Sequence, residues 1–403
     1  MIASLRAALA RSTVTLALLS AVPACAEKEP ATALSPGEVA LKKSLSDVDE
    51  GREIFRFDTF GNETFWSDSA GMHVKINALK PVDALAAGLK VDVAALPQSL
   101  IDAIVANPDL LNDPANTVAL IGLNAVVGVK GQVENGQLVR VGFTCALCHS
   151  TVDDSFTAGV GHRLDGWPNR DLNIGAIVAM SDAIPEFPYT TWGPGMYDPR
   201  FNIDGLNVPV VIPPAFGLAG VDKETYTGDG PVSYWNAYVA ITQMHGHGHF
   251  VDPRINVDIN NTPPDLVASK LAPLLAYQLS LETPRAKKGT FDQAAAARGR
   301  NVFRKAGCAE CHSGKLYTDI NEGILHDPAD VGQVSTYSDR SATKKFRTTP
   351  LRGLWNPPQL DGPYFHNGSA TTLMAVVEHY VGLFNLSLTT QQKNDLVEFL
   401  KTL

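Results

Sequence analysis

The sequence predicts a mainly α-helical fold with two similar domains in series, long ordered loops and an N-terminal insertion. The motif C-x-x-C-H occurs at residues 145–149 and again at 308–312. A segment that begins Gly-Arg and ends Phe-Arg lies ahead of each motif, at 51–56 and at 299–304. Because both features recur in the same order, they indicate a duplicated unit rather than two sites in one core.

Each motif has the spacing at which haem c is attached: two thiols add to the vinyl groups and the adjacent histidine ligates the iron. The cysteines stand about one helical turn apart, so both sulfurs can face the same porphyrin edge. Two copies in a chain with 5 cysteines predict two cytochrome c-type domains, each with one covalently bound haem c. The attachment residues are Cys145, Cys148 and His149 in the first domain and Cys308, Cys311 and His312 in the second.

Residues 1–26 are predicted to be a signal peptide. Arg6 and Arg11 precede a short apolar run, and small residues flank Cys25. The protein is therefore expected in the periplasm, since attachment of haem c requires export. Cys25 also loosely fits a lipoprotein processing site, which leaves a lipid anchor at Cys25 as an alternative. A flexible, polar leader is expected over 27–50.

Composition and charge narrow the classes of partner. The chain is 45% hydrophobic and 19% charged, as in soluble globular proteins, and its formal net charge is −9. A negative charge argues against nucleic acid and against anionic membranes as partners. It permits the docking of a basic electron carrier.

The N-terminal haem domain is predicted at 51–282, with an insertion at 57–140. Gly51 and Cys145 are 94 positions apart, whereas Gly299 and Cys308 are nine apart, so the first copy holds about 85 additional residues. Within the insertion, 97–106 and 114–123 are predicted helices with a proline near the start. Residues 129–141, with Asn-Gly in the middle, are predicted to form a β-hairpin.

The C-terminal haem domain is predicted at 283–403. A helix over 291–305 leads into the second motif, and a last helix with Thr389 and Gln392 as a capping box is expected to cross it. At the end of the first domain, a helix is predicted to start at Thr262 and its following prolines, and Pro273 to kink it. A weaker echo between 212–218 and 348–354 extends the repeat.

From residue 291 onward the sequence resembles the bacterial di-haem cytochrome c peroxidase and MauG superfamily. The enlarged first domain is closer to rubber-oxygenase-like relatives. The matching residues, about a quarter of the chain, are Gly299, Phe303 and the segments 308–312, 349–353, 362–373 and 376–380. The resemblance implies a di-haem oxidoreductase that uses hydrogen peroxide or oxygen, with Arg352 as a haem-binding residue.

The same resemblance implies that a residue after 363–366 supplies the sixth ligand of the second haem. Peroxidases place methionine there and MauG-like enzymes tyrosine, and this chain has Tyr380, 14 positions after His366. A phenolate stabilises oxidised iron, so it would give this haem a low potential. The alternatives are His379 as the ligand, or Tyr380 packed near the haem without ligating it. Met374 is expected in the core.

Several residues are candidates for the distal side of the first haem. His162 resembles the loop histidine that caps this haem in resting peroxidases, and a surface position is equally compatible. His245, His247 and His249 alternate with glycines, which suits a mobile loop, a haem pocket, or a metal site if an extended chain turns them to one side. Gln243 corresponds to a distal-pocket glutamine of the peroxidases.

Proton and electron transfer need further residues. Glu224, Asp229 and the histidine run are candidates for moving a proton between the two oxygens of peroxide. Trp235 is the candidate for carrying electrons between the haems, with plain packing as the alternative. The resemblance also implies one calcium ion between the domains. Its candidate ligands are Asp361, Pro363 and Asn173.

These features predict an exported oxidoreductase whose N-terminal haem activates peroxide or oxygen and whose C-terminal haem relays electrons. Tyr380 favours MauG-like oxidation of a protein or organic substrate. His162 favours peroxide reduction with electrons from a small cytochrome or cupredoxin, and the insertion favours a rubber-oxygenase-like dioxygenase. The alternative from another class is a non-enzymatic di-haem electron-transfer cytochrome with both irons six-coordinate. The candidate catalytic residues are His162, His245, Gln243 and Trp235.

Overall fold

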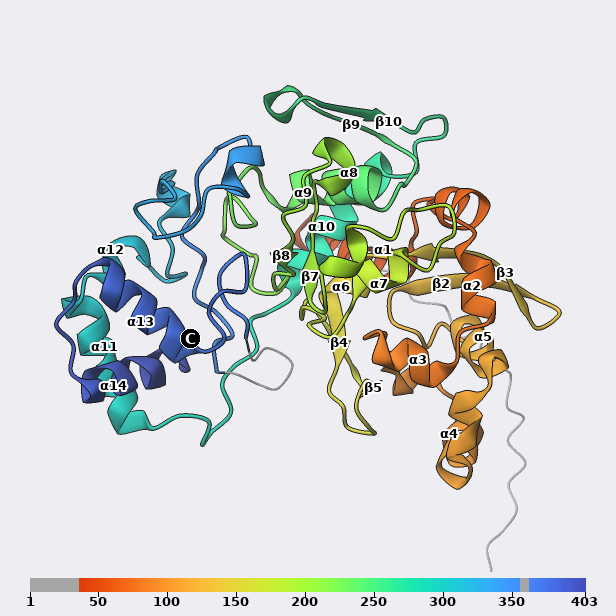
Figure 1. The fold of residues 1–403 in the computed structure, drawn as a ribbon, viewed down its shortest axis with the longest axis horizontal. Helices are drawn as coiled ribbons and strands as arrows, with labels where there is room; N and C mark the ends of the chain where they lie inside the picture. Colours follow the sequence, from red (N-terminus) through yellow and green to blue (C-terminus); the bar gives the residue numbers. More distant parts are fainter. Residues whose placement is uncertain (1–35, 356–361) are drawn as a thin grey trace, which may run out of the picture. The chain divides into compact units, whose positions relative to one another are not determined.

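The computed structural model describes residues 36–355 and 362–403, and the side chains from residue 43 onward (Figure 1). Residues 43–403 form one compact unit. The predicted signal peptide, Cys25 and residues 27–35 of the leader lie outside the described residues, as does Asp361. The prediction of a flexible leader was wrong for residues 36–50, which belong to the helix α1 (Pro36–Phe57). In the part of the chain that is described, no helix is both long enough and apolar enough to cross a membrane.

The fold is mainly helical, as predicted, and its strands pair only two at a time. The helices are α1 (Pro36–Phe57), α2 (Met72–Asn77), α3 (Pro81–Ala86), α4 (Gln98–Ala106), α5 (Pro114–Gly122), α6 (Ala146–His149), α7 (Ile174–Val178), α8 (Phe201–Asp204), α9 (Val232–Tyr238), α10 (Leu271–Ser280), α11 (Gln293–Lys305), α12 (Cys308–Cys311), α13 (Leu373–Leu383) and α14 (Thr390–Leu400). The strands are β1 (Val91–Asp92), β2 (Val129–Glu134), β3 (Gln137–Phe143), β4 (Ser150–Val152), β5 (Val160–Gly161), β6 (Arg163–Asp165), β7 (Met196–Tyr197), β8 (Val210–Val211), β9 (His249–Asp252) and β10 (Val257–Asn260). The pairs are β2 with β3, β4 with β6, β7 with β8 and β9 with β10, all antiparallel, and β1 with β5, parallel.

The predicted crossing of the last helix over α11 is confirmed: α11 and α14 lie side by side (Figure 1). Their closest approach is at Gly299, where a Cβ atom would lie 1.9 Å from the backbone oxygen of Asp395. One helical turn further along each helix, the rings of Phe303 and Phe399 pack with centroids 5.2 Å apart. The predicted capping box of Thr389 and Gln392 is present at the start of α14.

The first half of the chain repeats this crossing between α1 and α10. A Cβ atom on Gly51 would lie 1.9 Å from the backbone oxygen of Pro273. Four positions later on each helix, Phe55 packs against Tyr277 with ring centroids 5.5 Å apart. The glycine and the aromatic residue therefore hold the same places in both crossings, and the recurring segments at 51–56 and 299–304 owe their similarity to this close contact.

The helix before the second domain begins later than predicted, and this prediction was wrong at its N-terminus. Asp265 does cap a turn, since its side chain accepts from the backbone N–H groups of Val267 and Ala268, but α10 begins only at Leu271. The two prolines before Asp265 disfavour helical backbone at the residues that precede them. Pro273 consequently lies in the first turn, where a missing N–H breaks no helical hydrogen bond, and the reason for a kink disappears.

The insertion has the elements that its sequence predicts. The two predicted helices are α4 and α5, and Asp113 caps α5 with Pro114 at the first helical position. The helices α2 and α3 also lie in the insertion and were not predicted. The hairpin is β2 and β3, joined by a turn in which Asn135 and Gly136 have φ values of 50° and 76°. β3 leads directly into the first C-x-x-C-H motif, so the hairpin carries the chain to that motif.

Buried ion pairs join segments from both halves of the chain. Arg340 is bonded to Asp198, at 2.9 and 3.0 Å, and to Asp204, at 2.7 and 2.8 Å. Arg200 donates to Asp229 at 2.6 Å, and the side chains of Arg200, Arg340 and Asp198 are at most 3% exposed. Asp229 also accepts from two backbone N–H groups after Arg340. These pairs hold the segment at 337–343 against the residues that surround the first motif.

Candidate haem sites

The first motif lines a large cavity. Cys145, Cys148 and His149 lie on and next to the short helix α6, directly after β3. All three residues line a cavity whose interior measures about 280 Å³. This volume lies close to the lower end of the range of about 300–1,000 Å³ that is usual for ligand pockets. The first motif therefore faces a cavity of the size class that holds a ligand.

The donor atoms in this cavity fit haem c. Burial lowers the pKa of His149 to about 4, which keeps the imidazole in the neutral form that ligates iron. Nδ1 of His149 is buried and has no hydrogen-bond partner, and the carbonyl of Pro213 faces the ring without reaching hydrogen-bond geometry. A metal-bound histidine usually directs its other nitrogen at such a carbonyl. Burial also raises the pKa of the Cys145 and Cys148 thiols to about 12.

The second motif has a corresponding arrangement. Nδ1 of His312 lies 3.0 Å from the backbone oxygen of Tyr317. Burial lowers the pKa of His312, and the carbonyls of Tyr317 and Thr349 partly oppose that effect. Thr349 matches Pro213 in the repeat that relates 348–354 to 212–218. A carbonyl from the same repeat position therefore faces the histidine of each motif.

Tyr380 on α13 lies near the thiols of the second motif. Burial and, to a smaller extent, the nearby thiols of Cys311 and Cys308 raise the pKa of its phenol to about 12. His379, the alternative ligand, is engaged elsewhere, because its Nε2 lies 3.0 Å from the backbone oxygen of Val331. Of the two candidates, Tyr380 has the position that fits a ligand of the second haem.

Three of the four predicted catalytic residues, Trp235, Gln243 and His245, line the first cavity. Gln243 ends the π-helical turn η5 (Val239–Gln243), a form that is frequent at functional sites. Its Oε1 accepts a hydrogen bond of 2.5 Å from the Tyr197 hydroxyl. His245 has a φ of 63° and stacks on Phe65 with ring centroids 3.6 Å apart. Burial lowers the pKa of His245 to about 4, so its ring is neutral near pH 7.

His162 lies elsewhere. It follows β5 on the surface, and its side chain is 68% exposed. Its Nδ1 lies 3.2 Å from Asp153 and 3.1 Å from Ser155, and it is not among the residues that line the first cavity. The structure therefore does not bring His162 together with Gln243 and His245.

The histidine run does not present its three rings to one side. His245 has left-handed backbone and lines the cavity, whereas His247 packs beside Gly61 with a buried Nδ1 that has no hydrogen-bond partner. His249 is exposed and lies 2.8 Å from Asp258. The alternative that these three histidines form a separate metal site therefore does not fit the structure. The left-handed turn at His245 breaks the regular alternation that an extended chain would have.

The other predicted residues cluster around the first cavity. Trp235 on α9 lines it, and its buried Nε1 has no hydrogen-bond partner. Glu224 also lines it and is paired with Arg347, at 2.8 Å, and with Arg352, at 3.6 Å. Arg352 additionally donates to the backbone oxygen of Gly217. These ion pairs fix the position of the Glu224 side chain, as Arg200 fixes that of Asp229.

Sequence reasoning missed two residues of this region. Tyr197 is a cavity residue whose only sequence signal is its place after Trp-Gly-Pro-Gly-Met. Arg170 is a buried cation whose Nε and Nη1 have no hydrogen-bond partner, and it faces Tyr226, which lines the cavity. An unpaired buried cation is costly, and haem carries two carboxylates. Arg170 therefore fits a role in holding a haem propionate.

The predicted calcium site can be compared with the structure only in part. Asn173 caps α7, since its Oδ1 accepts from the backbone N–H of Ala176 at 3.0 Å, and this bond occupies the oxygen proposed for calcium. Asp361 lies outside the described residues. Within the described residues, the one group with metal-ligand geometry is Cys311, Asp319 and His326, which includes a cysteine of the second motif. The calcium ion stays a prediction.

Comparison with known proteins links the chain to two groups of haem enzymes. No protein-family model matches it. Among curated proteins, it is 31% identical over 158 residues to the methylamine utilization protein MauG of Methylorubrum extorquens, which covers 34% of this chain and 43% of that protein. It is 29% identical over 114 residues to the cytochrome c551 peroxidase of Nitrosomonas europaea, covering 26% of this chain and 33% of that one. The matched part thus spans less than half the length of these relatives.

A solved structure is also similar in part, that of hydrazine synthase of Kuenenia stuttgartiensis pressurized with 20 bar xenon. Its sequence is 20% identical to this chain, and the TM-score is 0.36. The similarity covers 52% of this chain and 76% of that one.

Proposed function

We propose that this chain, a relative of the di-haem cytochrome c peroxidase and MauG superfamily, is an exported di-haem oxidoreductase that oxidises a protein or organic substrate. Its N-terminal haem would activate peroxide or oxygen, and its C-terminal haem would relay electrons. One observation carries the proposal: the first motif faces a spacious cavity with a neutral histidine and a glutamine, whereas the second motif has a tyrosine near its thiols. The two sites are therefore equipped differently.

At the first site, Cys145 and Cys148 would hold the porphyrin and His149 the iron, and the bound haem would supply the redox chemistry. His245 is the group suited to proton transfer. Its neutral ring nitrogen would accept a proton and, with a pKa of about 4, release it again readily. Phe65, stacked on the imidazole, restricts the ring to one orientation. The bond from Tyr197 holds the Gln243 amide, so Gln243 can orient a polar molecule in the cavity.

At the second site, His312 and Tyr380 would hold the iron. A phenolate is a hard anionic donor, and it stabilises oxidised iron relative to reduced iron. Burial raises the pKa of the free Tyr380 phenol, whereas the positive charge of a bound iron would favour the phenolate. An iron held by two protein ligands would suit the storage of oxidising equivalents better than the binding of a new ligand. Tyr380 therefore supports MauG-like oxidation over simple peroxide reduction, for which the exposed position of His162 offers no capping ligand.

Spectroscopy of the holoprotein tests this division of labour. We expect the reduced protein to bind carbon monoxide at one haem only. Tyr380→Phe should change the absorption and paramagnetic resonance of the other haem and raise its reduction potential. Tyr317→Phe, which alters a second tyrosine next to the same motif, is the matched control and should leave the potential unchanged. If neither haem binds carbon monoxide or cyanide in any redox state, the chain is an electron-transfer cytochrome and the proposal fails.

The partner and the location follow from the same chemistry. A net charge of −9 suits a basic redox protein, a small cytochrome or cupredoxin, as the electron donor. We place the protein in the periplasm, either free or anchored at Cys25. Fractionation of cells followed by mass spectrometry of the mature N-terminus would distinguish these. A mature chain that retains residues 1–26 in the cytoplasm would contradict both.

A further inference from the structure

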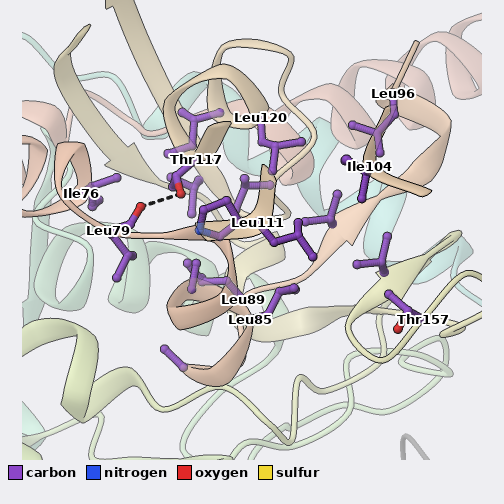
Figure 2. Close-up of a pocket in the computed structure, with 18 of the residues that line it drawn as sticks. Ile76, Leu79, Leu85, Leu89, Leu96, Ile104, Leu111, Thr117, Leu120 and Thr157 are labelled. Carbon is purple, nitrogen blue, oxygen red and sulfur yellow. Dashed lines mark hydrogen bonds between the residues drawn. The ribbon is translucent and has the colours of Figure 1, made fainter. Parts of the chain in front are cut away.

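A second cavity, lined by apolar side chains, lies within the insertion (Figure 2). Its open interior measures about 80 Å³. α3, α4 and α5 surround it together with β1 and the start of β2. Most of the lining falls within the predicted insertion at 57–140, and Leu85, Leu89, Leu111 and Leu120 point into the space in Figure 2. The insertion thus encloses a cavity that its helices do not fill.

The lining of the cavity is almost entirely apolar. Thr117 and Thr157 are the polar residues among those that line it. The Thr117 hydroxyl already donates to the backbone oxygen of Leu79 at 2.6 Å, as the dashed line in Figure 2 shows. Thr157 and Phe156 are exposed, so this end of the cavity lies at the protein surface. Apolar cavities of this kind stay dry and take up apolar molecules.

The apolar cavity and the first haem cavity share part of their walls. Phe143 and Ile177 line both. Phe143 ends β3 and stands two positions before Cys145, and Ile177 lies on α7. These two side chains therefore belong to the wall of both cavities. They mark the place where a small molecule would pass from the apolar cavity to the first haem site.

We propose that the apolar cavity binds small apolar molecules, and that its physiological occupant is dioxygen on its way to the first haem site. The inference rests on the proposed function and deepens it, since it names dioxygen as an oxidant that reaches this site. An apolar cavity of about 150 Å³ holds benzene or xenon, so 80 Å³ suits a guest of a few atoms. Hydrogen peroxide would lose its hydrogen bonds with water there and is excluded.

Xenon is the probe that tests the binding site, because it has the polarity of the proposed occupant and scatters strongly. Crystals of the full-length holoprotein under xenon pressure should show a xenon atom between α3 and α5. Ala84→Leu, which adds three carbon atoms to the lining, should abolish that peak. Val82→Leu on the same helix is the matched control, because Val82 is 43% exposed and does not line the cavity. Val126→Ile offers a smaller filling change if Ala84→Leu does not fold.

Carbon monoxide rebinding tests the connection to the haem. After photolysis of the reduced holoprotein, Ala84→Leu should slow rebinding from solution, and Val82→Leu should not. Absence of xenon from the wild-type cavity would overturn the inference, as would rebinding kinetics that Ala84→Leu leaves unchanged. Failure of the wild-type protein to bind carbon monoxide would instead overturn the proposed function, and xenon binding would still report on the cavity. The two failures are therefore distinguishable.

Discussion

Gly299→Ala probes the helix crossing on which the second haem site rests. A methyl group at this position would lie 1.9 Å from the backbone oxygen of Asp395 and 2.9 Å from Cβ of Phe399. Ordinary contact begins at 3.4 Å, so the oxygen would have to retreat by about 1.5 Å. The obstructing atom belongs to the backbone of α14, and no change of rotamer can relieve the overlap.

The cost follows from what the retreat would open. Phe303 and Phe399 pack one turn away from Gly299, and full burial of each ring stabilises by about 1.5–3 kcal/mol. A gap of about 1 Å forfeits up to half of the dispersion energy, so the two rings together would lose about 1.5–3 kcal/mol. Alanine in a helix regains about 1 kcal/mol relative to glycine. We expect Gly299→Ala to destabilise the protein by about 0.5–2 kcal/mol.

Urea unfolding of the holoprotein, followed by far-ultraviolet circular dichroism, measures this change. Gly382→Ala is the matched control, since Gly382 lies on α13 with no atom within 4 Å of its would-be Cβ. That substitution should stabilise by up to about 1 kcal/mol. A Gly299→Ala protein as stable as Gly382→Ala would refute the close crossing of α11 and α14.

Three further perturbations test other parts of the structure. Gly51→Ala should destabilise about as much as Gly299→Ala, because its Cβ would meet the Pro273 oxygen at the same 1.9 Å; a neutral effect would contradict the duplicated crossing. Arg340→Met should lower the free energy of unfolding by about 3–5 kcal/mol, because it leaves the buried Asp198 without its cation. The control Lys345→Met, beside the exposed Asp327, should lower it by less than about 1 kcal/mol. Burial lowers the pKa of His366 from 6.5 to about 4. Between these two pH values the unfolded chain therefore binds more protons than the folded chain. The free energy of unfolding should consequently fall as the pH falls, by up to about 1.4 kcal/mol per pH unit. His366→Gln should reduce that slope in pH-dependent unfolding. A slope equal to that of the unmodified protein would show that His366 is not buried in neutral form.

Local patterns in the sequence predicted much of the fold. Proline and capping residues indicated where α4, α5 and α14 begin, and Asn135-Gly136 indicated the turn between β2 and β3. Each of these features depends on residues within a few positions of one another, which is why the sequence alone sufficed. The late start of α10 was missed because the capping residue Asp265 serves a separate turn before the helix.

The sequence by itself determined the two haem-attachment motifs and the duplicated segments that precede them. Only the tertiary structure decided which distant residues meet at each motif. His245 enters the first cavity and His162 stays outside, although both stand beside glycine in loops. Likewise, no pattern within the insertion predicted an unfilled apolar space next to Phe143. The difference is physical: a motif's spacing is set by covalent chain geometry, whereas burial, ion pairing and cavities arise from packing between segments far apart in the chain.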